Sequence, residues 1–278
     1  MLGTRILTAV VLISVVLAAL FLLAPVGWGT VALIVVGIAA SEWAHLAGYR
    51  KAGRVLFIAV TLAIGIALLV TLAAGDEARW TAVMLASCGA ATVFWVFVAP
   101  PWLAFHWKPE SAVGMAIVGW IALTGAWVAL VALQARSPWL VLAAMAIVWI
   151  ADSAAYFTGR AFGRHKLAPR VSPGKTWEGV YGALVAVAIY ALALVPLAEA
   201  AGRSGGLNSW AIVVWVVCAL ALVALSIEGD LFESLLKRNA DVKDSGHLLP
   251  GHGGVLDRID ALLAAMPAAA LLAHVYLR

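Results

Sequence analysis

The chain of 278 residues contains few charged residues and almost no cysteine. Charged side chains make up 12% of the sequence and hydrophobic ones 65%, whereas a typical soluble domain has about 25% charged residues. This composition excludes an ordinary soluble globular domain. The two cysteines, Cys88 and Cys218, lie in separate apolar stretches. They therefore provide neither a disulfide framework nor a zinc site, because both need clustered ligands.

Long hydrophobic runs fill most of the sequence, and the mean hydropathy is +1.04. A bilayer core of about 30 Å requires about 20 apolar residues per helix. We therefore predict an all-α integral membrane protein, a polytopic bundle of about nine transmembrane helices with cytoplasmic polar loops. The first run is too long for a signal peptide and is taken as a permanent helix. The predicted spans are residues 5–24, 27–47, 54–74, 80–99, 111–134, 138–158, 177–199, 209–229 and 254–276.

Little sequence remains for a soluble domain. We expect a single membrane domain over residues 1–278, with an N-terminal helical part over 1–135 and a catalytic part over 136–278. With nine spans, 14 of the 18 lysines and arginines fall on one side of the membrane. Basic residues in short loops are retained in the cytoplasm. The prediction is a multi-pass protein of the cell (inner) membrane, with its N-terminus and its long polar loops inside and its C-terminus outside.

Carboxylates within a membrane span are costly, by at least ~2.5 kcal/mol at a helix centre, and are therefore candidates for function. Asp152 lies late in the sixth predicted span, and Tyr156 and Gly159 follow it on the same helix face. A packing seam of small residues has this pattern, and so does the wall of a site. We expect the wall of a site.

The stretch RVSPGKTWEG, residues 170–179, contains Ser172 before a proline. We interpret Ser172 as the N-cap of the seventh span and Pro173 as its first helical residue. Lys175 and Thr176 then lie in the first turn, where backbone N–H groups and a lysine favour an anion. A nucleotide-hydrolase P-loop would need a glycine in place of Pro169 and a preceding strand. A helix entry without a ligand is the alternative.

The stretch EGDLFESLLKR, residues 228–238, has one polar stripe if the eighth helix continues beyond the membrane. Asp230, Ser234, Lys237 and Arg238 follow one another at helical spacing. Such a stripe fits part of a site, and it fits an amphipathic interfacial helix equally well.

The stretch KDSGHLLPGHGGVLDRID, residues 243–260, combines charges and glycines between two apolar runs. Asp257 and Asp260 are three residues apart, so their carboxylates point the same way. Carboxylates without a neighbouring cysteine suit a hard cation such as Mg²⁺, which binds through one or two carboxylates plus substrate phosphates. His247 and His252 are weak candidates for zinc, because no third soft ligand is near.

Lys243 and Arg258 in the same stretch add positive charge for phosphate groups. Mg²⁺ with several phosphate-binding cations indicates phosphoryl or nucleotidyl transfer, in which the protein mainly positions groups and neutralises charge. A cytoplasmic nucleotide and a membrane site together indicate a lipid acceptor. The spacing names neither the nucleotide nor the lipid.

The stretch SLLKRNADVKDSGHLLPGHGGVLDRID, Ser234–Asp260, resembles the signature of the phosphatidate cytidylyltransferase (CDP-diacylglycerol synthase) family. That signature runs S-x-apolar-K-R, four residues, K-D-x-small, two residues, apolar-P-x-H-G-G, two residues, D-R-apolar-D. The sequence does not depart from it anywhere in these 27 residues. SPGKTWEG (172–179) and DSAAYFTG (152–159) resemble two further family elements, whereas residues 1–135 match only in hydropathy.

The resemblance implies that CTP condenses with phosphatidic acid to give CDP-diacylglycerol and pyrophosphate. It also implies Mg²⁺, as one ion or a two-metal centre, membrane lipids as surroundings, a homodimer, and no nucleic-acid partner. The implied metal ligands are Asp230, Asp257 and Asp260. The implied catalytic residues are these three with Lys243, Asp244 and Arg258. The implied substrate-binding residues are Asp152, Ser172, Lys175, Thr176, Glu178, Ser234, Lys237, Arg238 and His252.

Two rival functions stay open at this point. One is a related CTP-dependent enzyme acting on another lipid phosphate or on a polyprenol. The other is a membrane transporter that uses Asp152 and Glu42 as intramembrane carboxylates. A transporter would carry polar groups through the full depth of the bilayer, whereas here they gather at one face. Glu42 has no assigned role, and a helix-packing or interface position is the simplest interpretation of it.

Overall fold

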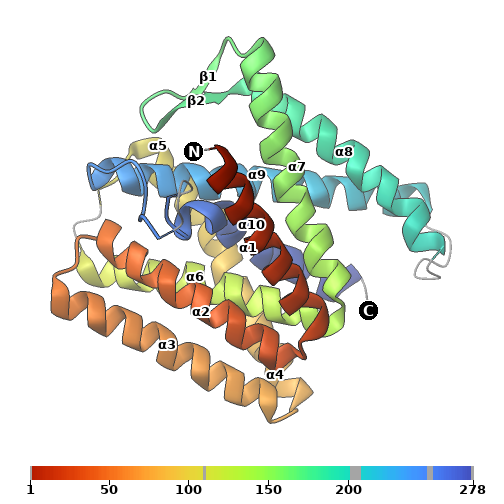
Figure 1. The fold of residues 1–278 in the computed structure, drawn as a ribbon. Coiled ribbons are helices and arrows are strands. Elements are labelled where there is room, and N and C mark those ends of the chain that lie inside the picture. Colours follow the sequence, from red (N-terminus) through yellow and green to blue (C-terminus); the bar gives the residue numbers. More distant parts are fainter. Residues whose placement is uncertain (1, 109–110, 201–207, 249–252, 277–278) are drawn as a thin grey trace.

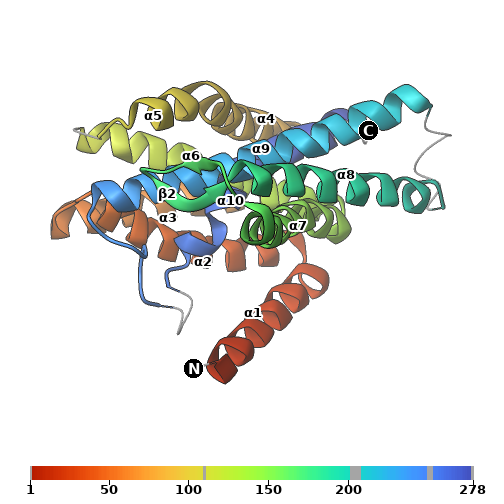
Figure 2. The ribbon, with the colours of Figure 1, turned by 90° about the horizontal axis from the view of Figure 1, so that it is seen from above.

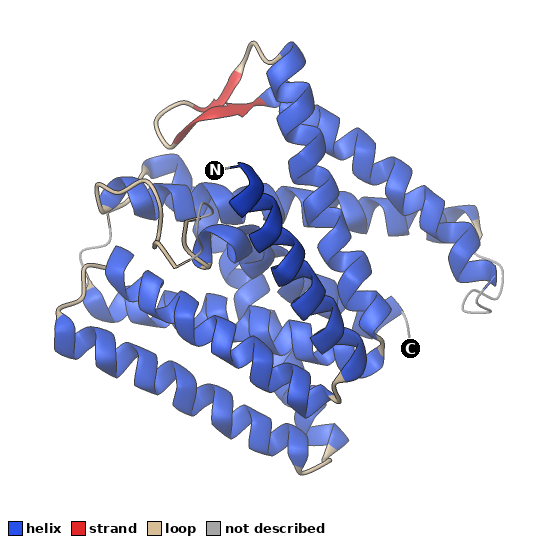
Figure 3. Cartoon of the chain, viewed as in Figure 1, coloured by secondary structure: helices blue, strands red, loops and turns tan. Residues whose placement is uncertain are grey.

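The computed structural model describes residues 2–108, 111–200, 208–248 and 253–276. Within these ranges, long helices alternate with short connections and one two-stranded hairpin (Figure 3). The helices and strands in chain order are α1 (Leu2–Leu22), α2 (Pro25–Leu46), α3 (Lys51–Ala73), α4 (Glu77–Val93), the π-helix η1 (Phe94–Val98), α5 (Ala99–Phe105), α6 (Ala112–Arg136), α7 (Pro138–Phe162), β1 (Lys166–Ala168), β2 (Ser172–Thr176), α8 (Trp177–Ala200), α9 (Ser209–Asn239) and α10 (Leu256–Tyr276).

Eight helical segments of the described part are long and apolar enough to cross a membrane, and they correspond to the second to ninth predicted spans. For the first predicted span, the described apolar part of α1 is Ile13–Leu22. The fourth span is longer than predicted, because α4, η1 and α5 form one helix over Glu77–Phe105. Pro100 and Pro101 lack N–H groups, so the preceding turn widens into a π-helix. The all-α polytopic architecture is confirmed.

Helix α10 lies in the middle of the bundle, and α3 and α8 lie at its opposite edges (Figures 1 and 2). Every residue from 261 to 270 is buried. Most of them are alanine, so α9, α6 and α4 can approach α10 closely. Since α10 carries Asp257 and Asp260 of the predicted site, its central place fixes the position of that site in the fold.

Five aromatic rings join three parts of the bundle around Phe232 of α9. The Phe232 ring has centroid distances of 5.6 Å to Phe94 and 5.4 Å to both Trp95 and Trp102. Trp43 of α2 stacks on it at 6.5 Å. Aromatic pairs of this kind contribute about 0.5–1.5 kcal/mol each beyond the area that they bury. The cluster therefore holds α2, η1 and α5 against α9 near the polar end of α9.

The connections after α2, α5 and α9 meet at one end of the bundle. The Tyr49 hydroxyl donates to the Ala112 carbonyl at 2.7 Å, and the Asn239 amide donates to the Trp107 carbonyl at 3.4 Å. These connections belong to the basic side of the predicted arrangement. The residues that the sequence assigned to one face therefore gather at one end of the folded chain.

The interpretation of Ser172 as a helix N-cap is wrong. Residues Ser172–Thr176 form strand β2, which pairs antiparallel with β1, and α8 begins only at Trp177. Thr176 is the capping residue, since the Gly179 N–H donates to its hydroxyl at 3.2 Å. The pattern misleads because proline fits the first turn of a helix and also fits a strand in a two-stranded ribbon, where no N–H is needed on the open side. Lys175 is consequently a strand residue.

Glycines let the ends of α7 and α8 approach each other below this hairpin. A Cβ atom at Gly159 would lie 2.9 Å from the Thr176 hydroxyl oxygen, and one at Gly179 would lie 2.9 Å from the Ala155 carbonyl oxygen. Real Cβ atoms essentially never come this close to other heavy atoms. The small residues that follow Asp152 on α7 therefore form a packing seam with α8, and the side chain of Asp152 itself remains exposed.

Candidate active site

The first polar cluster joins the hairpin to α9. Lys175 of β2 forms an ion pair with Asp230 of α9 at 2.6 Å, and its ammonium group also lies 3.5 Å from the Ile227 carbonyl oxygen. The Ser234 hydroxyl donates to the other Asp230 carboxylate oxygen at 3.3 Å. Asp152 of α7 lies within electrostatic range of both Asp230 and Lys175. Four residues that the sequence singled out on three segments are thus brought together.

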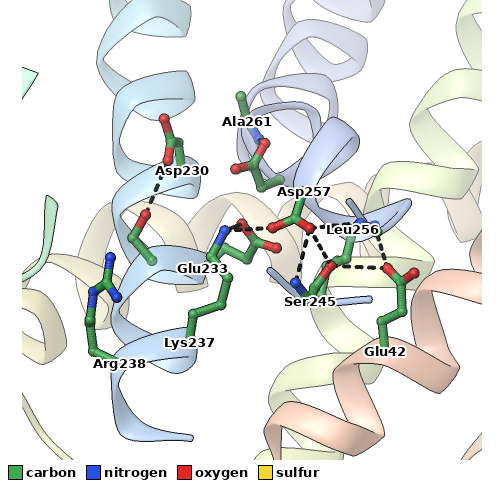
Figure 4. Close-up of polar contacts among 12 residues, drawn as sticks. Glu42, Asp230, Glu233, Lys237, Arg238, Ser245, Leu256, Asp257 and Ala261 are labelled. Carbon is green, nitrogen blue, oxygen red and sulfur yellow. Dashed lines mark hydrogen bonds and ion pairs between the residues drawn. The ribbon is translucent and has the colours of Figure 1, made fainter. Parts of the chain in front are cut away.

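The second cluster is centred on Lys237, about two helical turns beyond Asp230 on α9. Its ammonium group donates to Glu233 at 2.7 Å and to Asp257 of α10 at 2.6 Å (Figure 4). The three side chains are mostly buried, with exposed fractions of 13%, 4% and 6% for Lys237, Glu233 and Asp257. Buried charges persist only when they are paired and hydrogen-bonded, so this group defines the geometry between α9 and α10 tightly.

Asp257 also organises the loop that leads into α10. Its second carboxylate oxygen accepts from the Ser245 N–H at 2.9 Å, the Ser245 hydroxyl at 3.0 Å and the Gly254 N–H at 2.8 Å. The bond to Gly254, three residues upstream, has the geometry of a capping box at a helix N-terminus. Together with Lys237, four donors saturate this carboxylate. Within the described part of the chain, Asp257 therefore serves the loop and the lysine.

Glu42 of α2 reaches the same loop, although it lies 203 residues before Ser245 in the sequence. One oxygen of this buried carboxylate accepts from the Val255 N–H at 3.0 Å. The other oxygen accepts from the Leu256 N–H at 2.6 Å and from the Ser245 hydroxyl at 3.1 Å (Figure 4). Glu42 thus caps the first N–H groups of α10, which have no partner inside the helix. Sequence reasoning missed this contact.

Glycines of the loop make room for these two carboxylates. A Cβ atom at Gly254 would collide with the Ser245 hydroxyl and would lie 2.7 Å from Glu42, and one at Gly246 would collide with Glu42 as well. Gly253 has a φ of +81°, which other residues rarely adopt. These glycines permit a close approach of the loop backbone to other groups. What they approach in the structure is the protein's own carboxylates.

Asp260 completes the polar end of α10. One of its carboxylate oxygens accepts from the Ala261 N–H at 2.8 Å. The carboxylate lies within electrostatic range of Asp230, Glu233 and Lys237. It is therefore the residue that connects the first cluster to the second. One oxygen of Glu233 is buried and, among the described residues, has no hydrogen-bond partner.

The carboxylates of the two clusters differ in their fit to Mg²⁺. The described residues contain no group of three His, Cys, Asp or Glu side chains arranged around one point. Mg²⁺ commonly takes only one or two protein carboxylates, with water and substrate phosphates as its other ligands. Asp230 and Asp260, which repel each other electrostatically, meet that requirement. Asp257 fits less well, because four protein donors occupy its two oxygens.

The remaining predicted site residues lie around these clusters. The Arg238 side chain donates to the Val171 carbonyl at 3.3 Å, in the turn between β1 and β2. Glu178 accepts from the His165 ring at 2.7 Å, outside both clusters. Lys243 and Asp244 line a pocket behind the loop, Arg258 lies in the first turn of α10, and Ser172 lies on β2. His252 falls outside the described residues.

The sequence is similar to known proteins along almost its whole length. Residues 3–276 match the sequence model of the cytidylyltransferase family. The chain belongs to this family. A phosphatidate cytidylyltransferase of Pseudomonas aeruginosa is 42% identical over 98% of the chain and 97% of its own length. A phosphatidate cytidylyltransferase of Brucella suis is 37% identical over 95% of the chain and 90% of its own length. One of Haemophilus influenzae is 51% identical over 46% of the chain and 43% of its own length.

In this cytidylyltransferase, two acidic residues that contact the polar clusters lie outside the signature stretch. Glu233 lies one position away from the polar stripe of α9, among buried leucine and phenylalanine side chains. Glu42 lies more than 200 residues away from the loop that it caps. The signal for both was the same, a carboxylate in an otherwise apolar stretch, and only the fold shows which partners they have.

Proposed function

We propose that this cytidylyltransferase transfers the cytidylyl group of CTP to phosphatidic acid, giving CDP-diacylglycerol and pyrophosphate. The observation that carries the proposal is the full-length similarity to relatives named phosphatidate cytidylyltransferase. The gathering of cations and carboxylates at one end of a membrane bundle supports it. Such a site suits a water-soluble anionic nucleotide and a lipid phosphate that meet at the membrane surface.

The reaction needs no dedicated general base. An oxygen of the phosphatidic acid phosphate, already anionic at neutral pH, forms a bond to the α-phosphorus of CTP. The bond between that phosphorus and the bridging oxygen breaks, and pyrophosphate leaves with the electron pair. The main obstacle is repulsion between two anions. The positive charges of Lys175 and Lys237 would reduce this repulsion, because carboxylates on α9 and α10 hold their ammonium groups in place.

Asp230 and Asp260 would hold Mg²⁺ in this proposal. Asp257 would support them indirectly, through its contacts with Lys237 and the loop. Bound Mg²⁺ would neutralise phosphate charge and stabilise the leaving pyrophosphate. Asp257 instead orients Lys237 and the loop that follows it. Lys243 and Arg258 would contribute further positive charge for the phosphates from the loop and from the first turn of α10.

In this proposal the active site lies on the cytoplasmic side of the inner membrane, with the N-terminus inside the cell and the C-terminus outside. The unequal distribution of lysine and arginine supports that orientation. The contacts that bring the connections after α2, α5 and α9 to one end agree with it. A homodimer stays a prediction.

The test uses detergent-purified protein with CTP labelled in the cytidylyl group, phosphatidic acid and Mg²⁺. We expect label in the lipid extract and release of pyrophosphate, both dependent on phosphatidic acid and both abolished by EDTA. Transfer that continues in EDTA would remove the metal from the proposal. Transfer to a polyprenol phosphate but not to phosphatidic acid would favour the related lipid enzyme. Folded protein that transfers no label from CTP to any lipid would overturn the proposed function.

A further inference from the structure

Glu42 is a buried ionisable residue to which the proposed chemistry gives no task. Its exposed fraction is 7%, and it lies on α2, far in sequence from every residue of the signature stretch. A carboxylate at this depth is retained only if its environment compensates for the lost water. The described structure supplies three protein donors, all from one loop: the Ser245 hydroxyl and the Val255 and Leu256 N–H groups.

Those donors belong to the start of α10, the helix that carries Asp257 and Asp260. The first backbone N–H groups of a helix lack partners and carry partial positive charge, so a carboxylate there is stabilising. Charge-assisted hydrogen bonds of this type are shorter and stronger than neutral ones. The 2.6 Å bond from the Leu256 N–H fits that description. Glu42 therefore sets where α10 begins.

Ser245 connects Glu42 to the residues of the site. Its hydroxyl lies 3.1 Å from a Glu42 oxygen and 3.0 Å from an Asp257 oxygen, so one hydrogen faces two carboxylates. Asp257 in turn binds Lys237 at 2.6 Å. A continuous set of contacts thus runs from α2 through Ser245 and Asp257 to the ammonium group of Lys237 (Figure 4).

The loop is shaped around the Glu42 carboxylate. Gly246 and Gly254 face it from two sides, and a Cβ atom at either position would collide with a side chain of this group. The apolar neighbours of Glu42 on α2, including Trp43 and Ala39, are fully buried. The Glu42 carboxylate forms its hydrogen bonds with Ser245, Val255 and Leu256.

We propose that Glu42 is a positioning residue for cytidylyl transfer, which holds Ser245, Val255 and Leu256 in place and, through Ser245 and Asp257, aims Lys237 at the phosphates of the substrates. This inference rests on the proposed function. Glu42 contacts no reacting group in this view. It acts on residues that do, as the outer partners of metal ligands act on the ligands themselves.

The test compares Glu42→Gln with Glu77→Gln, the same chemical change at an exposed position in the first turn of α4. Glutamine keeps the size of the side chain but replaces one accepting oxygen with a donor, which cannot accept from Val255 or Leu256. We expect kcat/KM for CTP to fall about 10- to 100-fold, the usual loss for a residue that orients site groups. Hydrogen exchange should accelerate in peptides covering residues 245–248 and 253–256 and stay unchanged in α3 and α6. Glu77→Gln should match the wild type in both readouts.

A double-mutant cycle with Ser245→Ala distinguishes positioning from general stabilisation. If Glu42 acts through Ser245, the two changes should be strongly non-additive in kcat/KM, since contacting residues in one network are coupled. Additive losses, or faster exchange throughout the bundle, would overturn the positioning role. Normal transfer by Glu42→Gln would overturn it as well. If the wild type transfers no label, while Glu42→Gln still loses protection from hydrogen exchange in the loop, the proposed function alone is overturned.

Discussion

Lys237 joins the polar ends of α9 and α10 through two ion pairs. It neutralises a carboxylate of its own helix and one of α10, and all three side chains are mostly buried. The net gain from such an arrangement over apolar packing is small, because desolvation offsets the attraction. Breaking it by removing one partner is costly, about 3–5 kcal/mol, since a charge is then left buried and unpaired. A group with this balance is better explained by the geometry that it enforces than by stability.

Asp260→Asn tests the acidic residue that connects the two clusters. The asparagine oxygen can still accept from the Ala261 N–H, so insertion and purification should remain normal. We expect turnover to fall at least ~100-fold, because a proposed metal ligand loses its charge and metal binding supplies several kcal/mol to charge stabilisation. Label transfer to lipid measures the effect.

The matched control for this change is Asp241→Asn. Asp241 lies exposed at the same end of the bundle with a φ of +55°, which asparagine tolerates. This variant should remain within about twofold of the wild type. Near-normal turnover of Asp260→Asn would remove Asp260 from the metal site.

At the scale of elements, the hairpin β1–β2 places the Lys175 ammonium group next to Asp230 of α9. Lys175 enters the first cluster from β2, whereas Lys166 on the paired strand is exposed. Lys175→Ala leaves Asp230 without its ion pair, and we expect kcat/KM for CTP to fall about 10- to 100-fold, as when one member of a hydrogen-bonded charge pair is truncated. Lys166→Ala removes the same charge from the surface and should change the rate little. Equal losses in both variants would mean that only the net charge of the hairpin matters.

The start of α8 gives a second prediction at this scale. Thr176→Val removes the hydroxyl that accepts from the Gly179 N–H and should lower the free energy of unfolding by about 0.5–2 kcal/mol. Ser172→Ala, at the position that the sequence pattern favoured as the cap, should stay within about 0.5 kcal/mol of the wild type. Thermal unfolding in detergent, followed by circular dichroism, compares the two. The reverse order would restore the helix start at Ser172.

At the scale of the whole molecule, the proposed orientation assigns each connection to one side of the membrane. We expect Lys166→Cys to react with a membrane-impermeant maleimide only in inside-out vesicles, and Ala74→Cys only in right-side-out vesicles. Both positions are exposed and lie at opposite ends of the bundle. The background for both is a chain with Cys88 and Cys218 replaced by alanine. The opposite labelling pattern would reverse the topology and would move the proposed site to the outer face.

The sequence was most informative where one segment determines its own structure. Apolar runs predicted the helices, and helical spacing placed Asp230, Ser234 and Lys237 on one face of α9. It was least informative where a contact joins distant segments. Glu42 looked like a packing residue, because its donors lie beyond residue 244 and nothing near it in sequence indicates them. The hairpin was missed for a local reason, since Pro173 suits a helix start and an open strand edge alike.

The contact between Glu42 and the start of α10 also has a consequence in time. The hydrogen bond from Ser245 spans 203 residues, which a ribosome adds in roughly 10–40 s at ~5–20 residues per second. Throughout that interval α2 resides in the membrane with its carboxylate uncapped, and a chain released before Val255 lacks two of its three donors. The start of α10 takes its final form only near the end of synthesis. A chain released before Val255 also lacks Asp257 and Asp260, so we expect it to transfer no cytidylyl group.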